Sequence, residues 1–409
     1  MRFLWTIPWF AIRNLLREPR RSAMALAAVT FGIVALMLAS GFIEWIYYDL
    51  RESTIHSKLG HLTIARPGYL EAGRADPFAY LLPADTAALQ RVRSTPHVRE
   101  VAPRLYFSGL VSHGETTVSF VGEGVQPSLE TDLSRAVLIE QGASLRDDDP
   151  KGVLFGAGLA QSLGVRVGDT VVLLANTPSG GVNAVELVVR GLFTTVSKAY
   201  DDSALRVPIA IAQTLLRVQG AHAWIVLLDD TSNTDEVAKV LRQELPHDRF
   251  EVTTWYAQAD FYRKTVSLFS KQVGVVRLII AAIIVLSISN TLTMAVLERT
   301  GEIGTSMALG VPRRRILAQF MAEGTALGLL GGVIGLVLGF LLALAVSAIG
   351  IPMPPPPGMA HGYIGQVKVT PDLAASAFVL ATVTAIVASV YPAWRASRLA
   401  IVDALRHNR

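Results

Sequence analysis

One arrangement constrains this chain more than any other feature: four long apolar stretches, with a polar stretch of more than two hundred residues between the first and the second. Residues 22–43, 278–297, 324–349 and 373–394 contain no Asp, Glu, Lys or Arg. About 20 apolar residues in a helix cross the hydrocarbon core of a bilayer, and buried helices of soluble proteins rarely reach that length without a charge. The sequence therefore predicts a membrane protein with four transmembrane helices and a large α+β domain inserted between helices 1 and 2.

The predicted boundaries divide the chain into nine segments. The four transmembrane helices are expected at residues 22–44, 272–297, 317–349 and 373–394. The remaining segments are an N-terminal segment 1–21, an extramembrane domain 45–271, a loop 298–316, a loop 350–372 and a tail 395–409. In the N-terminal segment Trp5, Trp9, Ile12 and Leu16 share one helical face. That pattern is typical of a helix lying in the membrane interface, although a plain basic flank of the first span fits equally well.

Arginine is distributed unevenly across the predicted loops. Arg residues gather in residues 1–22, in the loop 298–315 and in the tail, whereas the loop 350–372 has only Lys368 and Asp372 as charged residues. Short Arg-rich loops stay in the cytoplasm, so both termini and the 298–316 loop are predicted to be cytoplasmic. The large domain is then expected on the outer side of the membrane.

Net charge and cysteine content exclude several classes of function. Residues 44–271 have 22 Lys+Arg and 27 Asp+Glu (−5), and the remainder has 15 and 6 (+9), which together give the +4 of the chain. The basic residues therefore follow membrane topology, and no nucleic-acid partner is predicted. The absence of cysteine excludes disulfides, thiolate metal sites and a cysteine nucleophile. The eight histidines show no metal-binding spacing, so no metal, cofactor or catalytic residue is predicted.

The extramembrane stretch alternates strand-like and helix-like runs. One β-α-β pattern lies near each end: residues 61–66, 85–93 and 98–111, and then residues 224–228, 234–245 and 250–254. Asn233 and Glu236 have the spacing of a helix N-cap and its N3 partner. We expect one α+β subdomain whose two halves meet in space. A helix 156–164, a strand 170–175, a turn 177–181 and a strand 185–193 predict a second, mostly β lobe inserted into the first.

Two helical arms are predicted to join this domain to the membrane. Residues 44–58 read as a continuation of the first span. Residues 255–276 have no Pro, and no Gly before Gly274, so they read as a helix that runs directly into the second span. Twenty residues of helix reach about 30 Å. We therefore expect a paired helical stalk, with Trp255 and Val266 in its second arm.

The loop after the second span has the most specific sequence. It leaves the membrane with Glu298-Arg299, places Ile303, Met307 and Leu309 on a short amphipathic helix, and reaches Gly310 with Pro312 beyond. Gly followed by Pro is typical of a helix C-terminus. A short helix with an exposed apolar face suits docking into a groove of a partner protein, and an ordinary connecting loop is the alternative.

These motifs resemble a known family. ERTGEIGTSMALGVPRRRI (residues 298–316), followed by FMAEG (320–324), is similar to the signature of FtsX/MacB-type ABC transporter permeases. The tail motifs YPAWRASR (391–398) and DALR (403–406) and the order of one span, a large insert and three spans extend the resemblance over the whole chain. GHLTI (60–64) and RPGY (66–69) resemble the LolC/LolE lipoprotein-release branch. The loop MPPPPG (353–358) departs from that branch.

The resemblance implies a site and partners. The 298–316 loop would be a coupling helix that docks on a separate ATPase subunit, and ATP and Mg²⁺ would bind to that partner, because this chain lacks a G-x-x-x-x-G-K-[ST] motif. The chain is then a permease subunit and not an enzyme. The implied coupling residues are Glu298, Arg299, Glu302, Ile303, Met307, Leu309, Gly310, Arg313 and Arg314. The insert would be a periplasmic domain with porter-like and sabre-like lobes, in a bacterial inner membrane.

The uncharged membrane spans contain glycines and one asparagine that are expected to contact neighbouring helices. Gly328 and Gly332, and likewise Gly331, Gly335 and Gly339, are spaced four residues apart, which lets two helix backbones approach closely. Whether these glycines pack within one subunit or across a dimer stays open at this point. Asn290, in the interior of the second span, is expected to hydrogen-bond to a neighbouring helix.

Two functions remain at the level of sequence. The first is a permease that transmits ATP-driven motion to the outer domain in order to extract a lipoprotein, lipid or other amphiphile, with a periplasmic carrier and membrane lipid as further partners. The alternative is an FtsX-like regulatory scaffold that activates a cell-wall hydrolase. The size of the insert favours the first. The cargo, and whether a second permease copy in the assembly is identical or a paralogue, stay open.

Overall fold

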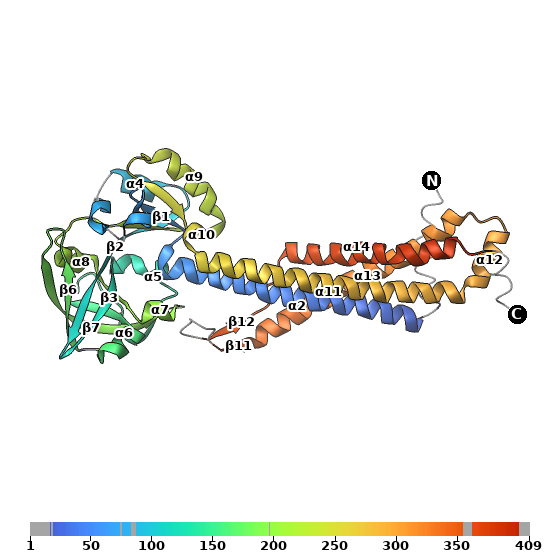
Figure 1. Cartoon of the computed structure of the whole chain (residues 1–409), viewed down its shortest axis with the longest axis horizontal. Coiled ribbons are helices and arrows are strands. Elements are labelled where there is room, and N and C mark those ends of the chain that lie inside the picture. Colours follow the sequence, from blue (N-terminus) through green and yellow to red (C-terminus); the bar gives the residue numbers. More distant parts are fainter. Residues whose placement is uncertain are drawn as a thin grey trace. The chain divides into compact units, whose positions relative to one another are not determined.

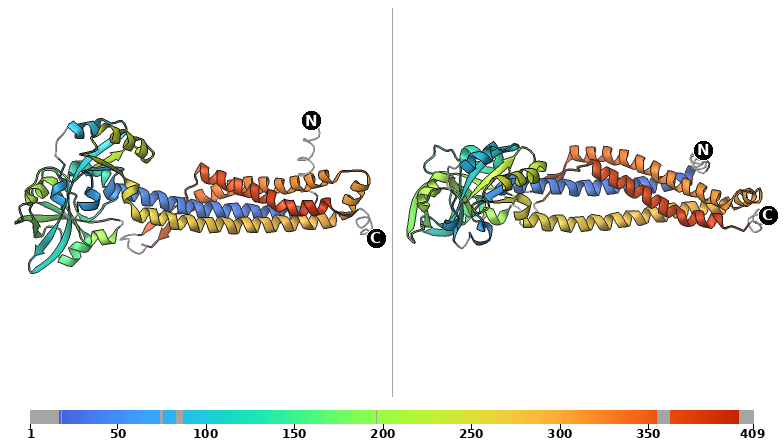
Figure 2. Two further views of the ribbon diagram at one scale, coloured as in Figure 1. Left: turned by 45° about the horizontal axis from the view of Figure 1, so that its top comes forward. Right: turned by 90° about the horizontal axis from the view of Figure 1, so that it is seen from above.

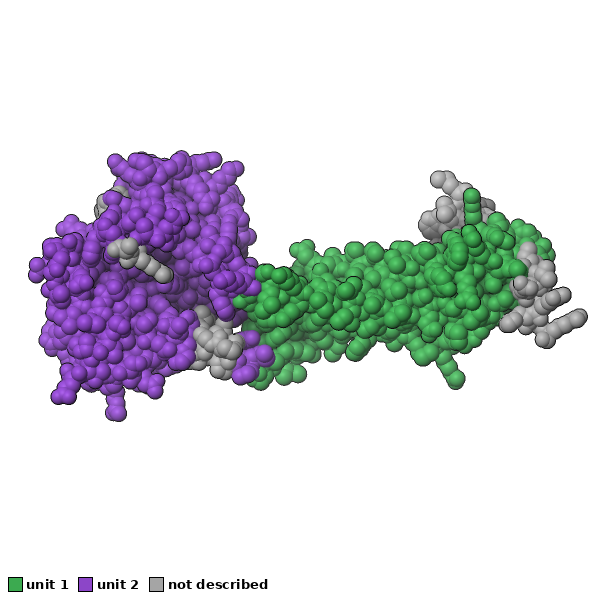
Figure 3. All heavy atoms as spheres, viewed as in Figure 1, with its two compact units in different colours: residues 1–47, 265–352, 364–409 green, residues 48–264, 353–363 purple. Residues whose placement is uncertain are grey.

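A computed structural model describes residue 17 and residues 19–73, 76–82, 87–195, 197–354 and 362–400. The aromatic residues expected in an interfacial N-terminal helix, the DALR motif and most of the proline-rich loop lie outside these residues. The chain divides into two compact units, coloured separately in Figure 3. The helical unit comprises residues 1–47, 265–352 and 364–409, and the α+β unit comprises residues 48–264 and 353–363.

Four long helices correspond to the four apolar stretches (Figure 1). They are α2 (Pro19–Thr54), α11 (Asp260–Glu298), α13 (Arg313–Ile349) and α14 (Pro371–Ser397). All four are long and apolar enough to cross a membrane. At 1.5 Å per residue, the 39 residues of α11 span roughly 58 Å, about twice the thickness of a hydrocarbon core. A substantial part of this helix therefore lies outside lipid.

Of the two predicted helical arms, the first is continuous with its membrane helix and the second is interrupted. The helical continuation of the first span is confirmed, because α2 runs to Thr54 and passes into a π-helical turn, η1 (Ile55–Leu59). The prediction of an unbroken helix from residue 255 is wrong. Trp255–Gln258 forms a separate short helix, α10, and Ala259 leaves the helical region before α11 begins at Asp260. The Asp260 carboxylate, which pairs with Arg263, lies in the first turn of α11, where the helix dipole favours a negative charge.

The two ends of the insert meet in one sheet, as predicted. Strand β1 (Leu62–Ala65) lies between β9 (Ala223–Leu228) and β10 (Glu251–Thr254), and β9 also pairs with β2 (Val98–His113), all antiparallel. Helices α4 (Ala87–Ser94) and α9 (Thr234–Glu244) bury their apolar faces against this sheet. The shared core is formed by Leu62, Ile64, Leu89, Val92, Trp224, Val226, Val237 and Leu241.

The predicted cap of helix α9 is wrong in its contacts. Asn233 occupies the N-cap position but makes no side-chain bond to the first turn. Its amide Nδ2 instead donates to Asp229 Oδ1 at 2.9 Å. A 3-10 turn, η4 (Thr231–Asn233), precedes α9, and the carboxylate of Asp230 accepts from the N–H of Ser232 in that turn. The local capping bonds are therefore made one turn earlier than the spacing predicted.

Six strands of the second lobe close into a ring. From β2 the order is β3 (Thr116–Val125), β8 (Ala204–Pro208), β5 (Gly152–Gly156), β7 (Val182–Thr194) and β6 (Thr170–Asn176), and β6 pairs with β2 again. The pairs β3–β8 and β5–β7 are parallel, and the other pairs are antiparallel. Helices α6 (Ala157–Leu163) and α8 (Ile209–Leu216) pack against the apolar core of this small barrel.

The barrel confirms the predicted helix 156–164 and strands 170–175 and 185–193, but the lobe is not a simple insertion. Residues 98–104 of β2 pair with β9 in the first lobe, and residues 105–113 pair with β3 in the barrel. One sixteen-residue strand therefore belongs to both lobes. The sequence predicted a strand over residues 98–111, but it gave no signal that the partner strand changes halfway.

The remaining elements are short. In the α+β unit they are α3 (Tyr69–Ala72), η2 (Pro77–Tyr80), η3 (Pro127–Leu129), α5 (Glu130–Leu133), β4 (Leu138–Gly142) and α7 (Lys198–Asp201). Helix α12 (Thr300–Ala308) lies between α11 and α13, and the ribbon β11 (Ile351–Met353) and β12 (Tyr363–Gly365) lies between α13 and α14. Helices α13 and α14 run side by side in all the views of Figures 1 and 2.

Candidate coupling site

Helix α12 is a separate nine-residue helix between two long ones. It ends as the sequence predicted. Gly310 has a φ of 92°, a left-handed conformation that glycine adopts without strain, and the N–H of Val311 donates to the carbonyl of Ser306 at 3.1 Å. Pro312 then stands at the N-cap of α13, where its missing N–H costs nothing. This geometry fixes a sharp turn between α12 and α13.

The expectation of an exposed apolar face on α12 is wrong for two of its three residues. Ile303 and Met307 are 6% and 7% exposed, and only Leu309 is open to solvent, at 82%. The buried pair packs in a small core at this end of the helical unit. That core consists of Val296 from α11, Ile316 and Phe320 from α13, Ala393 and Ala396 from α14, and Ile303 and Met307 from α12. Burial of apolar area against three helices favours this orientation over an exposed one.

The outer surface of the loop is formed by polar and charged residues around one leucine. Glu298, Glu302, Leu309, Gly310, Arg313 and Arg314 are exposed, and Arg299 is half-buried. Of the nine predicted coupling residues, six therefore lie on the surface, and Arg299, Ile303 and Met307 face the helical unit. We call the exposed residues Glu302, Leu309, Arg313 and Arg314 the α12 surface.

Three ion pairs connect this end of the helical unit. Arg299 Nη1 lies 3.2 Å from Glu323 Oε1 on α13, and these side chains are 15% and 4% exposed. Arg21 on α2 pairs with Glu298, and Arg17 Nη2 lies 3.8 Å from Glu302 Oε1. These residues surround a cavity of about 160 Å³. The buried Arg299–Glu323 pair is the one that fixes geometry, because exposed pairs contribute little to stability.

The two glycine rows of α13 contact two different helices of the same chain. A Cβ on Gly328 would lie 2.3 Å from Ala385 Cβ on α14, and Gly332 faces Phe378 on the same helix. On the other row, Gly331 faces Val29, Gly335 faces Ile33 and Gly339 faces Met37, all on α2. Both rows therefore pack within one subunit, and α13 approaches α14 and α2 at once.

Asn290 lies on the second long helix, as predicted, but its side chain does not point at another helix of the described part of the chain. Its side chain is exposed on α11, and among the described residues its amide has no hydrogen-bonding partner. The predicted hydrogen bond to a neighbouring helix is not found among the described residues of this chain, and it stays a prediction. The neighbouring residues Ile284, Ile288 and Leu292 are the ones that face the bundle.

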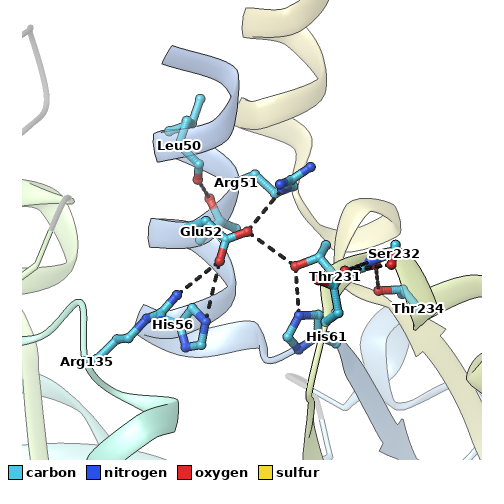
Figure 4. A network of polar contacts seen from close by, with 11 residues as sticks. Leu50, Arg51, Glu52, His56, His61, Arg135, Thr231, Ser232 and Thr234 are labelled. Atoms are coloured by element: carbon cyan, nitrogen blue, oxygen red, sulfur yellow. Dashed lines mark hydrogen bonds and ion pairs between the residues drawn. The ribbon is translucent and has the colours of Figure 1, made fainter. Parts of the chain in front are cut away.

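Glu52 joins the end of α2 to several segments of the α+β unit (Figure 4). Its carboxylate accepts from Arg135 Nη2 at 3.1 Å, from Arg51 Nε at 3.2 Å and from Thr231 Oγ1 at 3.3 Å. His61 Nε2 lies 3.0 Å from the same Thr231 oxygen, and His61 Nδ1 accepts from the N–H of Leu228. Burial lowers the pKa of His61 to about 4, so this ring is neutral at pH 7.

The two predicted stalk residues have different surroundings. Trp255 is buried in the α+β unit with Ile55, Leu133 and Ala223, and its ring meets that of Tyr262 edge to face at 4.9 Å. Val266 lies on α11 in the helical unit, and its carbonyl accepts from the hydroxyl of Tyr47 on α2 at 3.2 Å. Tyr47 also lies 3.2 Å from Ser270 Oγ, so α2 and α11 are joined by side-chain bonds near Tyr47.

Two protein families match this chain. Residues 22–244, more than half of the chain, match the MacB-like periplasmic core domain, and residues 274–401 match the FtsX-like permease C-terminal family. The chain belongs to the FtsX/MacB family of ABC transporter permeases.

Several curated proteins resemble this FtsX/MacB-family permease at modest identity. An uncharacterized ABC transporter permease of Methanocaldococcus jannaschii is 28% identical over 66% of this chain and 65% of its own length. The lipoprotein-releasing system transmembrane protein LolC of Neisseria meningitidis is 24% identical over 98% of both chains. The macrolide export ATP-binding/permease protein MacB of Nitrobacter winogradskyi is 24% identical over 98% of this chain and 61% of its own length.

Several residues that organise the site of this FtsX/MacB-family permease were not found from sequence. Arg17, Arg21 and Glu52 read as ordinary flanking charges, and the pairing of Arg299 with Glu323 across 24 residues has no local signature. One signal was available for that pair, because Glu323 directly precedes an uncharged stretch of α13 and a carboxylate at that depth needs a cation. No His/Asp/Glu cluster suited to a metal is found among the described residues.

Proposed function

We propose that this chain is the permease subunit of an ABC transporter in which a separate ATPase docks on the α12 surface. ATP-driven motion of that partner would be passed through the long helices to the α+β unit, which would extract or export an amphiphile such as a lipoprotein or lipid. In this proposal the α+β unit is periplasmic, the termini are cytoplasmic, and two permease copies share the assembly in a bacterial inner membrane.

The observation that carries the proposal is the packing beneath the α12 surface. Ile303 and Met307 insert into a core contributed by α11, α13 and α14, so α12 cannot move without displacing the ends of three long helices. The Gly310 turn and the Arg299–Glu323 pair remove further freedom from the loop. A rigidly held helix with one exposed leucine and an arginine cluster suits the transmission of force from a docked partner.

Three features support the choice of partner and substrate class. The loop in which the α12 surface lies is Arg-rich, which favours a cytoplasmic location where an ATPase is available. Among the relatives, LolC is named for lipoprotein release and MacB for macrolide export, and both cargoes combine apolar and polar parts. The α+β unit of two lobes is large compared with what binding a single activator would require. We therefore favour substrate handling over the regulation of a hydrolase.

The test uses the exposed and buried faces of α12 separately. Leu309→Asp places a charge on the proposed docking surface without disturbing the core, and we expect it to reduce co-purification of the ATPase encoded beside the permease gene by tenfold or more. Leu138→Asp is the matched control, because Leu138 is 55% exposed in the α+β unit and should leave ATPase binding unchanged.

The Glu302→Lys variant adds an independent reading of the same surface. It reverses a charge on the α12 surface and should weaken ATPase stimulation while the chain still inserts into membranes. Wild-type amounts of ATPase, stimulated normally, in both Leu309→Asp and Glu302→Lys would overturn the docking assignment. A periplasmic hydrolase that is activated by the intact complex, with no transported amphiphile, would instead support the regulatory alternative.

A further inference from the structure

Two buried histidines lie where the helical continuation of α2 ends (Figure 4). His56 lies in the π-helical turn η1 and His61 lies directly before β1, and the two residues are 6% and 2% exposed. Their rings meet edge to face with centroids 6.1 Å apart. Between pH 5 and pH 8 histidine is the residue type that ordinarily changes charge. This pair therefore places proton uptake at the attachment of α2 to the α+β unit.

The hydrogen bonds of His61 leave no atom for a second proton. The N–H of Leu228, at the end of β9, donates to His61 Nδ1 at 3.1 Å, so the neutral ring carries its proton on Nε2. His61 Nε2 donates to Thr231 Oγ1 at 3.0 Å, and that hydroxyl donates to Glu52 Oε1 at 3.3 Å. A proton on Nδ1 would set two N–H groups against each other, so a charged His61 must leave Leu228. Burial accordingly lowers the pKa of His61 to about 4.

His56 presents its free nitrogen to the same carboxylate. His56 Nδ1 lies 2.8 Å from the carbonyl of Asp132 on α5 and, because a carbonyl only accepts, Nδ1 carries the proton. Nε2 then faces Glu52 Oε2 at 3.7 Å. A proton on Nε2 would give Glu52 a new cationic partner that competes with Thr231. Burial lowers the pKa of His56 and Arg135 adds to the lowering, although the Asp132 carbonyl and Glu52 oppose it.

Charged groups of both signs surround the pair. Glu52 on α2, Asp132 on α5 and Asp230 before η4 supply carboxylates. Arg51 and Arg135 supply guanidinium groups, and both donate to Glu52. Histidine is the residue type among these whose charge ordinarily changes between pH 5 and pH 7. A change of pH in that range therefore acts on this site through the two rings.

The bond from the same turn to the barrel has a different chemistry. Arg206 Nη2 on β8 donates to the carbonyl of Ser57 at 2.9 Å, and Arg206 Nε lies 3.2 Å from Glu123 Oε2 on β3. The Arg206 and Glu123 side chains are 3% and 1% exposed. Arginine stays charged at every physiological pH. Proton uptake by the histidines would therefore loosen η1 from the end of β9 and leave its bond to the barrel in place.

We propose that His56 and His61 form a proton-sensitive joint, which ties the end of α2 to the first lobe at neutral pH and releases Thr231 and Leu228 on acidification, while the bond to the barrel persists. This inference rests on the proposed function only in placing the α+β unit outside the cytoplasm, where pH follows the surroundings. Repulsion between two charged rings 6.1 Å apart assists the release. Acid would then change which lobe follows a movement of α2.

The direction of the pH effect follows from burial. Both rings have a pKa below the ordinary value of 6.5 when the joint is closed. The joint is therefore complete above pH 6.5 and is lost as the pH falls towards 4, because the open form takes up protons that the closed form excludes. For His61 alone, the opening equilibrium should rise about tenfold between pH 7.5 and pH 5.5.

Hydrogen exchange of the full-length protein, bound to its ATPase in lipid nanodiscs, measures this opening. Each exchange rate is divided by that of an unstructured amide at the same pH, which removes the intrinsic effect of acid. Peptides covering residues 48–62 and 224–232 should show the tenfold rise, and peptides from β8 should not. The absence of a rise in the first two segments, or an equal rise in β8, would overturn the proposal.

Substitution of the rings separates proton uptake from a structural role. His61→Asn places an oxygen near the position of Nδ1, can still accept from Leu228 and takes up no proton. The slope of log exchange against pH should fall by about one proton per opening. A merely structural His61 would instead raise exchange at every pH with the slope unchanged, which would refute the joint.

Two further variants complete the series. His56→Asn keeps a donor for the Asp132 carbonyl and should also lower the slope, so it serves if His61→Asn does not fold. His247→Asn, at an exposed position of the same unit, should keep the wild-type profile. ATPase co-purification is scored in the same preparations. A flat profile with normal ATPase binding would refute the joint and leave the proposed function standing, whereas lost ATPase binding with the acid response intact would support the joint and refute the docking assignment.

Discussion

Arg299 Nη1 lies 3.2 Å from Glu323 Oε1, and this buried pair joins the last turn region of α11 to the interior of α13. The two residues flank the short helix α12, so the pair closes the loop that contains the α12 surface. Removal of one partner would leave a charge without its counter-ion in a site where the side chains are 15% and 4% exposed.

We predict that Glu323→Gln destabilises the helical unit by about 3 kcal/mol, because Arg299 then loses its counter-ion while still buried. Thermal unfolding of the purified protein in detergent, followed by intrinsic fluorescence, measures this. Glu302→Gln is the matched control, since its pair with Arg17 is more than 60% exposed on both sides and should change stability by less than about 1 kcal/mol. Equal effects of the two substitutions would contradict the assignment of the buried pair as the structural one.

A methyl group on the glycine row that faces α14 should separate two helices. In Gly328→Ala the new Cβ would lie 2.3 Å from Ala385 Cβ, so α13 and α14 must move apart, at an expected cost of about 1–3 kcal/mol. Gly274→Ala on α11 is the control: nothing lies within 4 Å of its Cβ position, and alanine favours helix, so stability should stay level or rise by up to about 1 kcal/mol.

The Gly328 prediction includes a rescue. Ala385→Gly removes the methyl group that the new Cβ meets, so the double variant should recover a large part of the lost stability. Unfolding midpoints of the four proteins form a double-mutant cycle. Additive effects of the two substitutions would show that the α13–α14 contact is not the source of the cost.

Glu52→Ala should loosen the attachment of α2 to the α+β unit. The substitution removes the acceptor shared by Arg51, Arg135 and Thr231, and leaves their donors to solvent or to strained alternatives. We expect a loss of about 2–3 kcal/mol and faster proteolysis within residues 48–61, since hydrogen bonds to a charged group are the stronger ones. Glu115→Ala, at an exposed turn, should leave the proteolysis rate unchanged; similar rates in the two variants would refute the role of Glu52.

The α+β unit should lose stability as the pH falls below 6.5. Burial lowers the pKa of both His61 and His222 to about 4, and the Nδ1 atom of each accepts a backbone N–H, so the folded state keeps both rings neutral. Between pH 6.5 and pH 4 the unfolded chain binds protons that the folded chain does not, so stability present above pH 6.5 is lost on acidification. The loss should reach about 3 kcal/mol for each histidine.

Unfolding of the full-length protein at pH 7.5, 6 and 5 checks this slope. His222→Gln should flatten it by about half, whereas His247→Gln, at an exposed position, should leave it unchanged. A double variant of His61 and His222 with the wild-type slope would show that other groups cause the pH dependence.

Sequence reasoning was most successful where the signal is local or periodic. The four apolar helices, the Gly310 turn and the strands and helices at both ends of the α+β insert all follow from patterns within a few residues. Closure of the barrel by β6 was not predictable, because pairing of β6 with β2 joins segments that are distant in the sequence, such as Ser112 and Val172. The β6–β7 pair is a local hairpin and followed from the predicted turn between the two strands.

Side-chain direction on α12 shows the limit for the site itself. Ile303, Met307 and Leu309 were assigned to one exposed face, but only Leu309 points outward, since the first two find apolar partners on three other helices. Composition identifies an amphipathic helix and cannot tell whether its apolar side meets its own chain or another. Asn290 shows the same limit. A polar residue in a span predicts a hydrogen-bonding partner, but the sequence does not say which helix supplies it, and none does in the described part of this chain.

The two glycine rows of α13 also restrict how this helix can change in length. Inserting or deleting one residue between Gly328 and Gly335 would turn everything beyond that point by about 100°. A helix with one partner can absorb such a change by rotating as a whole, but α13 contacts α14 through one row and α2 through the other, so no single rotation restores both. Natural variation in length should therefore be excluded from the middle of α13, and should collect in the α13–α14 connection.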